Sequence, residues 1–233
     1  IALVLNNIDG WIIRSGTKIL EEHILKAKKL QIIGRAGVGT DNIDIESATL
    51  NGIIVMNVPD GNTISAAEHT IAMISALSRN IQLGHMGLMN GSWDRHKLVG
   101  NELRGKILGV VGLGKIGREV IKRALSFDMN ILGFDPYVSQ EHFDESEIKI
   151  VSLDELTEKS DFITLHVPLN DATKDLFDLD RMKKMKKNSK IINVARGGII
   201  NEEDLAKSLN DGLISGAAID VFSKEPIDKN HNL

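Results

Sequence analysis

The chain has 233 residues, and 28 lysines and arginines against 32 aspartates and glutamates give it a formal net charge of -4. This length can bury a sizeable hydrophobic core, in one large domain or in two small ones. The sequence contains no cysteine, which excludes disulfide scaffolds, cysteine-ligated zinc and cysteine nucleophiles.

The charge balance and the apolar pattern also argue against two classes of partner, nucleic acids and membranes. A mildly negative charge argues against bulk binding to nucleic acid or to anionic lipid. No stretch approaches the ~18 uninterrupted apolar residues of a membrane span, and residues 1–8 lack the basic lead of a signal peptide. We expect a cytoplasmic protein without nucleic-acid or membrane partners, and we assign no metal site.

The first part of the chain alternates short apolar strands with helices. The pattern predicts strands over residues 10–14, 31–34 and 53–56, and helices over residues 19–29 and 45–51. This alternation is typical of a parallel sheet. We therefore predict a first α/β block that ends near residue 57.

Two long helices follow this block. After turn-forming residues at 57–62, the apolar pattern predicts helices over residues 63–80 and 81–89. Both are apolar on more than one face, and such helices need more than one partner surface. Residues 58–93 are therefore candidates for contacts between subunits.

Strands and helices alternate again from Lys106 onwards. The pattern predicts strands over residues 107–112, 130–134, 149–151, 162–166, 190–194 and 215–220, with helices over residues 115–127, 153–159 and 202–209 among them. This order predicts a second α/β block with a doubly wound parallel sheet of the Rossmann type. We interpret the lysine-rich run 181–190 as a solvated helix end.

A glycine fingerprint follows the first strand of the second block. Gly112, Gly114 and Gly117 have the G-x-G-x-x-G spacing between an apolar strand and an amphipathic helix, and Asp135 ends the next strand. Such glycines permit a tight turn, the approach of a pyrophosphate and the packing of the helix on the strand. Asp135 would accept hydrogen bonds from ribose hydroxyls, and Pro136-Tyr137-Val138 offers no arginine for a 2′-phosphate. The motif predicts NAD rather than NADP; the alternative is a glycine-rich turn without a dinucleotide.

Two further candidates follow the last two strands. Arg196 comes directly after a strand end, where ligands lie in folds of this type, and its guanidinium suits a carboxylate or a carbonyl oxygen. Glu225 follows the last strand. From the residues alone, Arg196 has the alternative of a surface arginine beside a glycine turn. For Glu225, an exposed turn residue is the simpler interpretation.

Several runs together resemble the D-2-hydroxyacid dehydrogenase family, and within it most closely the phosphoglycerate dehydrogenases. These runs are Gly34–Asp44, Ser65–Thr70, the glycine loop, Leu165–Leu169, the Arg196 motif and Ala217–Pro226. The resemblance covers essentially the whole chain. It implies an NAD-dependent oxidoreductase with a partial, flavodoxin-like substrate-binding domain over residues 1–57 and a nucleotide-binding domain over residues 58–233.

The resemblance also implies roles for single residues. Arg196 matches the arginine that binds the substrate carboxylate and carbonyl, and Glu225 matches the glutamate that holds the catalytic histidine. Val38 and Gly39 match the loop whose backbone amides meet the carboxylate. The positions that match cofactor contacts are Val38, Gly112, Gly114, Lys115, Ile116, Gly117, Asp135, His166, Val167, Pro168, Val194, Ala195, Arg196 and Asp220.

Two arginines at neighbouring strand ends indicate an anion site. Arg14 and Arg35 match the arginines that face the substrate phosphate in phosphoglycerate dehydrogenases; the alternative is that they pair with surface carboxylates. The implied reaction is the NAD-dependent oxidation of D-3-phosphoglycerate to 3-phosphohydroxypyruvate, the first step of phosphorylated serine biosynthesis. The alternatives are a hydroxypyruvate or glyoxylate reductase and, from another class, an NAD(H)-sensing corepressor-like binding protein.

The acid–base histidine of the family has no counterpart by motif in this sequence. The resemblance places it after Glu225 in a Pro-His-x-Gly context, and the sequence reaches only Leu233. We therefore expect the interior of a longer enzyme, which retains much of the binding and loses most of the proton transfer. We interpret His166 as a structural residue at a strand end. The family also implies a homodimer built on residues 58–93.

Overall fold

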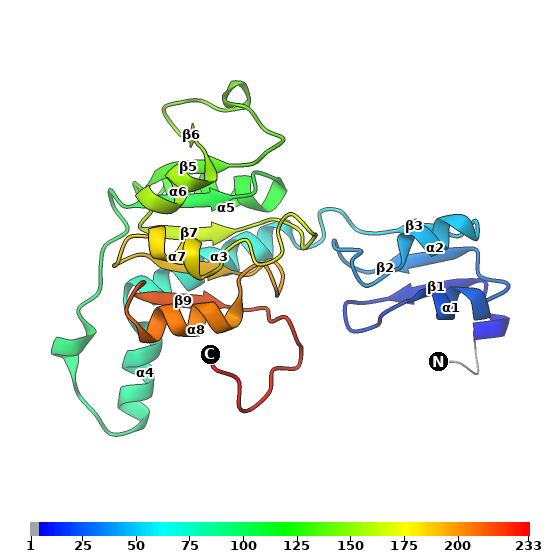
Figure 1. Ribbon diagram of the computed structural model, residues 1–233, viewed down its shortest axis with the longest axis horizontal. Coiled ribbons are helices and arrows are strands. Elements are labelled where there is room, and N and C mark those ends of the chain that lie inside the picture. Colours follow the sequence, from blue (N-terminus) through cyan, green and yellow to red (C-terminus); the bar gives the residue numbers. More distant parts are fainter. Residues whose placement is uncertain (1–4) are drawn as a thin grey trace. The chain divides into compact units, whose positions relative to one another are not determined.

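Residues 5–233 are described in the computed structural model, which is drawn in Figure 1. The chain forms two compact units that divide between Thr63 and Ile64. The boundary predicted from the sequence, after residue 57, falls slightly earlier, in the turn before the first long helix. Each unit has its own parallel sheet and its own hydrophobic core.

The N-terminal unit is a small α/β sheet. Its elements are the short 3-10 helix η1 (Leu5–Asn7), β1 (Gly10–Ile13), α1 (Glu21–Lys26), β2 (Ile32–Arg35), α2 (Ile45–Leu50) and β3 (Ile54–Met56). The strands pair in parallel in the order β1-β2-β3, and Ile13 lies opposite Arg35. Helix α1 is shorter than the predicted 19–29 because Ile19 forms a parallel bridge with Ile43 instead of the first helical turn.

The C-terminal unit contains a six-stranded parallel sheet. Its strands are β4 (Ile107–Val111), β5 (Asn130–Phe134), β6 (Lys149–Ile150), β7 (Phe162–Leu165), β8 (Lys190–Asn193) and β9 (Gly216–Ile219). They lie side by side in the order β6-β5-β4-β7-β8-β9. The chain builds the sheet outwards from β4 in one direction up to β6, and then continues in the other direction from β7, on the opposite side of β4. This is the doubly wound order of a Rossmann sheet, in which ligands bind outside the carboxyl ends of the strands at the reversal point. The predicted fold class is confirmed.

Helices cover both faces of the six-stranded sheet, as Figure 1 shows. They are α3 (Thr63–Ser78), α5 (Lys115–Leu125), α6 (Leu153–Lys159), α7 (Leu179–Lys184) and α8 (Glu202–Asn210). On one face, Ile74 of α3 and Val120 of α5 are fully buried in a common cluster. On the other face, Leu156 of α6, Met182 of α7 and Leu205 of α8 are fully buried. Each such side chain contributes about 1.5–3 kcal/mol of hydrophobic stabilisation.

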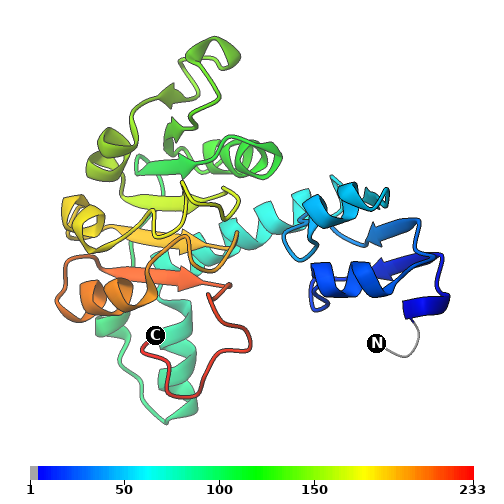
Figure 2. The same ribbon diagram turned by 45° about the vertical axis from the view of Figure 1, so that its right-hand side comes forward.

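Helix α4 (Ile81–Met89) lies beyond the β9 edge of the sheet in both ribbon views (Figures 1 and 2). None of its residues is buried. It packs against the short helix η2 (Arg95–Leu98). A further short helix of this unit, η3 (Gln140–His142), lies between β5 and β6 in the chain. Apart from its contact with η2, the apolar surface of α4 remains exposed within the described part of the chain.

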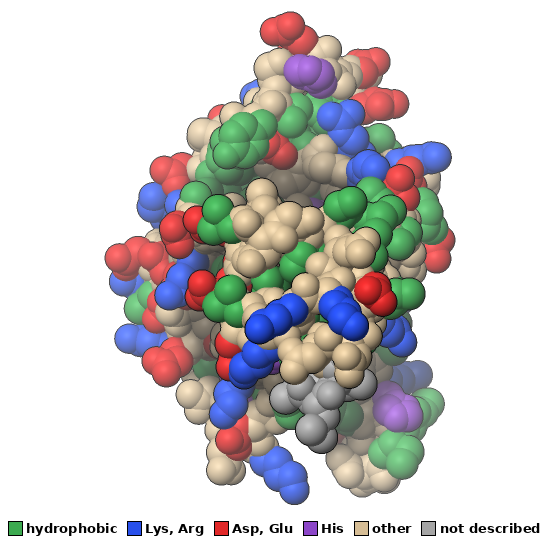
Figure 3. Space-filling view, turned by 90° about the vertical axis from the view of Figure 1, so that its right-hand side faces the viewer, with side chains coloured by type: hydrophobic (Ala, Val, Ile, Leu, Met, Phe, Trp, Pro, Cys, Tyr) green, Lys and Arg blue, Asp and Glu red, His purple; other side chains and the backbone are tan. Residues whose placement is uncertain are grey.

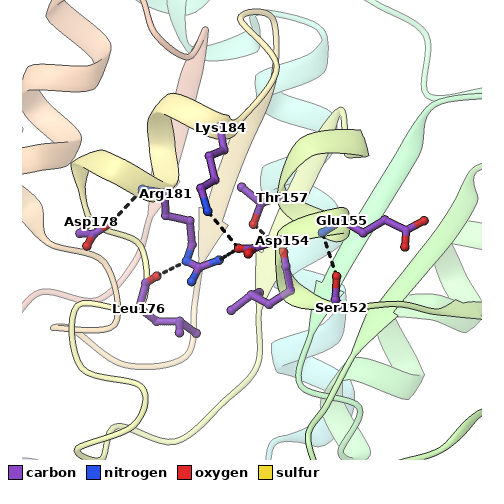
Figure 4. Close-up of polar contacts among 9 residues, drawn as sticks. Ser152, Asp154, Glu155, Thr157, Leu176, Asp178, Arg181 and Lys184 are labelled. Atoms are coloured by element: carbon purple, nitrogen blue, oxygen red, sulfur yellow. Dashed lines mark hydrogen bonds and ion pairs between the residues drawn. The ribbon is translucent and has the colours of Figure 1, made fainter.

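A carboxylate ties α6 to α7. Asp154 accepts hydrogen bonds from Arg181 Nη1 at 3.0 Å and from Lys184 Nζ at 3.4 Å (Figure 4). These cations, Lys184 foremost, hold the pKa of Asp154 below its usual range. Arg181 Nε also donates to the Leu176 carbonyl at 2.7 Å, so this side chain fixes the loop before α7 as well as the helix.

The surface carries charged groups of both signs. On the face drawn in Figure 3, basic, acidic, hydrophobic and uncharged polar side chains are interspersed. This mixture agrees with the small formal net charge of -4. Among the described residues, no helix has the length and apolar character that crossing a membrane requires.

Candidate functional site

The glycine loop lies at the carboxyl end of β4, where the strand order reverses. Gly112 has a φ of +96°, and a Cβ there would lie 2.5 Å from the His166 carbonyl oxygen. A Cβ on Gly117 would lie 2.1 Å from the Gly112 carbonyl oxygen. Both positions therefore need glycine for close backbone packing. In contrast, a Cβ on Gly114 would meet nothing within 4 Å, so the space beside this residue is open.

This open space lies at the start of α5. Gly114 is the N-cap of the helix and makes no side-chain capping bond, and Lys115 and Ile116 are the first helical residues. The start of a helix presents backbone N–H groups and a partial positive charge to an anion. A missing Cβ and an uncapped helix start at the same place fit the pyrophosphate of a dinucleotide.

Asp135 lies beside the glycine loop, directly after β5. Its Oδ2 accepts a hydrogen bond from the Leu113 N–H at 2.9 Å, and its Oδ1 accepts one from the Tyr137 N–H at 3.0 Å. These bonds hold the carboxylate in place and leave acceptor capacity, because an ionised carboxylate has about four lone-pair sites. The position therefore fits the predicted contact with ribose hydroxyls.

Arg196 lies in the turn after β8, and Asn193 holds that turn. The buried Asn193 side chain donates to the Arg196 carbonyl at 2.8 Å and accepts from the Ala195 N–H at 3.0 Å. Arg196 is half-buried, and its Nη1 donates to the Ala195 carbonyl at 2.7 Å. Val194 belongs to the same turn. The sequence reasoning missed the role of Asn193, although an asparagine at a strand end commonly bonds to the backbone that follows it.

The segment after β9 brings Asp220 and Glu225 to the same edge of the sheet. The Asp220 N–H donates to the Asn193 carbonyl at 3.0 Å. Its Oδ1 lies 3.5 Å from Nε2 of His69 on α3, a pair of partly exposed side chains that the sequence did not indicate. Glu225 is exposed, and its Oε1 accepts a hydrogen bond from the Phe222 N–H at 3.0 Å.

His166, Val167 and Pro168 follow β7 beside the glycine loop. The His166 N–H donates to the Val111 carbonyl at 2.7 Å, and its ring Nε2 lies 3.0 Å from Oγ1 of Thr164. Burial lowers the pKa of His166 to about 4. The ring is therefore neutral at pH 7, which supports the interpretation of His166 as a structural residue.

We expect His166 to make the folding stability depend on pH. Its pKa is about 4 in the folded chain and 6.5 in the unfolded one, so the unfolded state binds the proton first as the pH falls. Stability from the neutral ring is complete above pH 6.5 and is lost towards pH 4. Between pH 7 and pH 5 the loss should be about 1–2 kcal/mol for this half-buried side chain.

Urea denaturation at pH 7 and pH 5 measures this loss. His166→Gln should lose less stability than the wild type between the two pH values, because glutamine does not titrate. His142→Gln is the matched control, since His142 is exposed, and it should behave like the wild type. An equal loss in the wild type and in His166→Gln would contradict the expectation.

The other predicted site residues lie in the N-terminal unit. Arg14 is exposed and directly follows β1, and Arg35 is the last residue of β2. The Arg35 guanidinium lies over Gly37, where a Cβ would be 1.5 Å from Nη1, and it donates to the Ala36 carbonyl at 3.1 Å. Within the described residues, Nε of Arg35 is buried and has no hydrogen-bond partner.

Val38 and Gly39 form a half-buried loop after β2. Asn57 Nδ2 donates to the Val38 carbonyl at 2.7 Å and fixes this loop. The predicted site residues of the N-terminal unit therefore lie at or beyond the carboxyl ends of β1 and β2. The C-terminal unit collects the others beyond the carboxyl ends of β4, β5, β7, β8 and β9.

Comparisons with known proteins agree with this geometry. Residues 71–233 match the family model of the D-isomer specific 2-hydroxyacid dehydrogenase, NAD binding domain. D-3-phosphoglycerate dehydrogenase of Methanocaldococcus jannaschii is 48% identical over 223 residues, which are 95% of this chain and 43% of that protein. D-3-phosphoglycerate dehydrogenase of Bacillus subtilis is 46% identical over 222 residues, which are 95% of this chain and 42% of that protein. The chain thus spans about two fifths of the length of these relatives.

Solved structures have the same fold. The NAD-dependent formate dehydrogenase from Staphylococcus aureus in complex with NAD matches with a TM-score of 0.90 and 35% identity, over 99% of this chain and 70% of that one. The D-lactate dehydrogenase from Aquifex aeolicus complexed with NAD and lactic acid matches with a TM-score of 0.88 and 33% identity, over 96% of this chain and 67% of that one. These matches confirm the prediction of NAD as the cofactor. The chain therefore belongs to the D-isomer-specific 2-hydroxyacid dehydrogenases, and its residues 71–233 form the NAD-binding domain of that family.

Proposed function

We propose that the full-length polypeptide containing this chain is a cytoplasmic D-3-phosphoglycerate dehydrogenase that oxidises D-3-phosphoglycerate to 3-phosphohydroxypyruvate. Identities of 46–48% to curated D-3-phosphoglycerate dehydrogenases support the substrate. The absence of cysteine fits a reducing compartment. When bound, NAD supplies the hydride acceptor.

The observation that carries the proposal is the pair of arginines in the N-terminal unit. Ile13, which precedes Arg14, lies opposite Arg35 in the β1–β2 register, so both arginines lie at one edge of the sheet. The buried Nε of Arg35 lacks a partner among the described residues. A phosphate is a suitable ligand for two guanidinium groups, because its oxygens accept charge-assisted hydrogen bonds. A hydroxyacid without a phosphate has no second anionic group for these two arginines to bind.

The chain's own residues have distinct roles in the proposed reaction. Arg196, in the turn held by Asn193, binds the substrate carboxylate and the oxygen on C2. The backbone amides of Val38 and Gly39 donate to the same carboxylate. Glu225 orients the acid–base group that takes the hydroxyl proton. The glycine loop and Asp135 hold the cofactor at the end of β4.

Calorimetry on the NADH-loaded, full-length polypeptide tests the substrate. We expect 3-phosphoglycerate to bind at least about 10-fold more tightly than D-glycerate, because one bond to an arginine contributes ~1.5–3 kcal/mol. Arg14→Gln and Arg35→Gln should each lose most of this preference. Lys29→Gln is the control, since Lys29 precedes β2 at the opposite edge of the sheet. Equal binding of both acids by the wild type would instead favour a hydroxypyruvate or glyoxylate reductase.

We also propose that α4 and the turn after it contact a second copy of the chain. Leu83 is 60% exposed, Leu88 58% and Trp93 76%. These three side chains, together with Leu98, line a cavity of about 400 Å³ between α4 and η2. Leu83, Leu88 and Trp93 lie within the predicted dimer contacts at 58–93, and Leu98 lies five residues beyond them. A two-fold dimer would cover these exposed apolar side chains.

Sedimentation velocity tests the dimer. Leu88→Asp should weaken dimerisation by at least about 100-fold, because a buried carboxylate without a partner costs several kcal/mol. Leu50→Asp is the matched control, since Leu50 is 81% exposed in the N-terminal unit, and it should leave the dimer intact. Sedimentation of the wild type as a monomer at micromolar concentration would exclude the dimer.

A further inference from the structure

A largely covered carboxylate links helix α8 to the segment after β9. Glu202, the first residue of α8, accepts a hydrogen bond from the Ser223 N–H at 2.6 Å and one from the Ser223 hydroxyl at 3.0 Å. Its Oε2 also lies 2.9 Å from Nε2 of His231. The Glu202 side chain is only 12% exposed, and that of His231 22%. A carboxylate with this many donors fixes the backbone that donates to it.

The backbone held by Glu202 lies against the turn that carries Arg196. A Cβ on Gly197 would lie 2.0 Å from the Phe222 carbonyl carbon and 2.4 Å from the Ser223 nitrogen. The Phe222–Ser223 peptide therefore packs directly on the Gly197 backbone. The Phe222 N–H in turn donates to Glu225 Oε1 at 3.0 Å. Glu202 is thus connected through Ser223 and Phe222 to the carboxylate of Glu225.

Stabilisation of α8 does not account for these contacts. Asn201 already caps the helix by accepting from the Asp204 N–H at 3.1 Å. Glu203 and Asp204 supply the negative charge that the first turn of a helix favours. Glu203 is exposed, whereas Glu202 turns away from the helix to Ser223 and His231. Its contacts therefore serve the segment after β9.

We propose that Glu202 is a positioning residue that sets the location of Glu225 relative to Arg196. Its carboxylate accepts the Ser223 N–H, which belongs to the Phe222–Ser223 peptide that packs on Gly197. The Phe222 N–H, one peptide earlier, donates to Glu225. His231 adds a second attachment further along the same segment. This inference rests on the proposed role of Glu225 and extends the site to a residue that touches neither substrate nor cofactor.

A double-mutant cycle in the full-length polypeptide tests the inference. Glu202→Gln keeps one acceptor oxygen and loses the charge, and it should lower kcat by about 10- to 100-fold. The Kd for NADH should stay within about 3-fold of the wild-type value, because Glu202 is outside the glycine loop. If Glu202 acts through Glu225, the double variant E202Q/E225Q should be no slower than E225Q alone. Glu203→Gln is the matched control, with the same charge change one residue along α8, and should keep the wild-type kcat.

Four outcomes separate the inference from the proposed function. Effects of E202Q and E225Q that multiply, or a wild-type kcat in E202Q, would overturn the positioning role alone. A wild-type kcat in E225Q would overturn both the role of Glu225 and the inference built on it. If another D-2-hydroxyacid is turned over in place of 3-phosphoglycerate, the proposed substrate fails, and the cycle is measured with that acid.

Hydrogen exchange gives a second readout that does not depend on turnover. In E202Q the amides of residues 222–225 should exchange at least about 10-fold faster than in E203Q, because the Ser223 N–H loses its charged acceptor. Ser223→Ala removes only the hydroxyl contact and provides a milder variant if E202Q folds poorly; it should lower kcat by about 2- to 5-fold. Unchanged exchange in E202Q, or a wild-type kcat in Ser223→Ala, would contradict the inference.

Discussion

Gly114→Val is expected to weaken NADH binding by at least about 100-fold, or ~2.7 kcal/mol, without changing the fold. The missing Cβ of Gly114 is surrounded by open space, and its φ of -71° suits any residue. Valine is therefore compatible with the backbone of the unliganded protein. Its side chain would fill the volume through which a pyrophosphate approaches the start of α5. Calorimetric titration with NADH, together with thermal unfolding, measures both quantities.

Gly117→Val is the matched control and should show the opposite pattern. A Cβ there would lie 2.1 Å from the Gly112 carbonyl oxygen, so the side chain would push α5 away from the loop. We expect the free energy of unfolding to fall by about 3 kcal/mol, at the upper end of overpacking effects. If Gly114→Val keeps the wild-type affinity for NADH, the pyrophosphate does not lie at the start of α5.

Replacement of Arg196 should have the largest effect on turnover. In the full-length polypeptide, Arg196→Gln should lower kcat/KM for the hydroxyacid by about 1000-fold, because it removes a charge-assisted pair to the carboxylate together with the donor to the C2 oxygen. Arg196→Lys should recover only part of this loss, since lysine keeps the charge and lacks the planar fork. Steady-state kinetics with NAD and the hydroxyacid measure the ratio.

Cofactor binding separates a loss of substrate contacts from a collapse of the site. The Kd for NADH should remain within about 3-fold of the wild type in Arg196→Gln, because Asn193 holds the turn through backbone groups. Arg104→Gln is the control for a lost positive charge, since the Arg104 side chain is 80% exposed and precedes β4, whereas the site turns follow the carboxyl ends of the strands. Retention of kcat/KM within 3-fold in Arg196→Gln would remove this arginine from the proposed mechanism.

The features that the sequence predicted correctly depend on local chemistry. Buried strands appear as short apolar runs, and the order of strands and helices restricts the sheet to a doubly wound topology. Gly112 and Gly117 are required by backbone packing inside one strand–turn–helix unit, so their spacing in the sequence is sufficient to identify the loop. Asp135 could be predicted to lie beside that loop because β4 and β5 are neighbours in this topology.

The features that the sequence did not reveal depend on partners far along the chain. Glu202 contacts residues 21 and 29 positions away, and no local pattern distinguishes it from Glu203.

The interpretation of the lysine-rich run 181–190 as a solvated helix end holds for only part of that run. Helix α7 ends at Lys184, whereas Lys190 begins β8 and is buried, with Nζ 3.2 Å from the Ser215 hydroxyl. Burial lowers the pKa of Lys190, an environment that composition alone does not predict.

The close contact at Gly197 has a consequence for recombination between relatives. The Phe222–Ser223 peptide leaves no room for a Cβ on Gly197, so neither segment can change its course independently of the other. A chimera with a crossover between residues 197 and 222 would take the Gly197 turn from one relative and the Phe222–Ser223 segment from another. The two segments would then either clash or lose their contact. Crossovers placed before Asn193 and after Pro226 would instead exchange the interlocked pair as a single cassette.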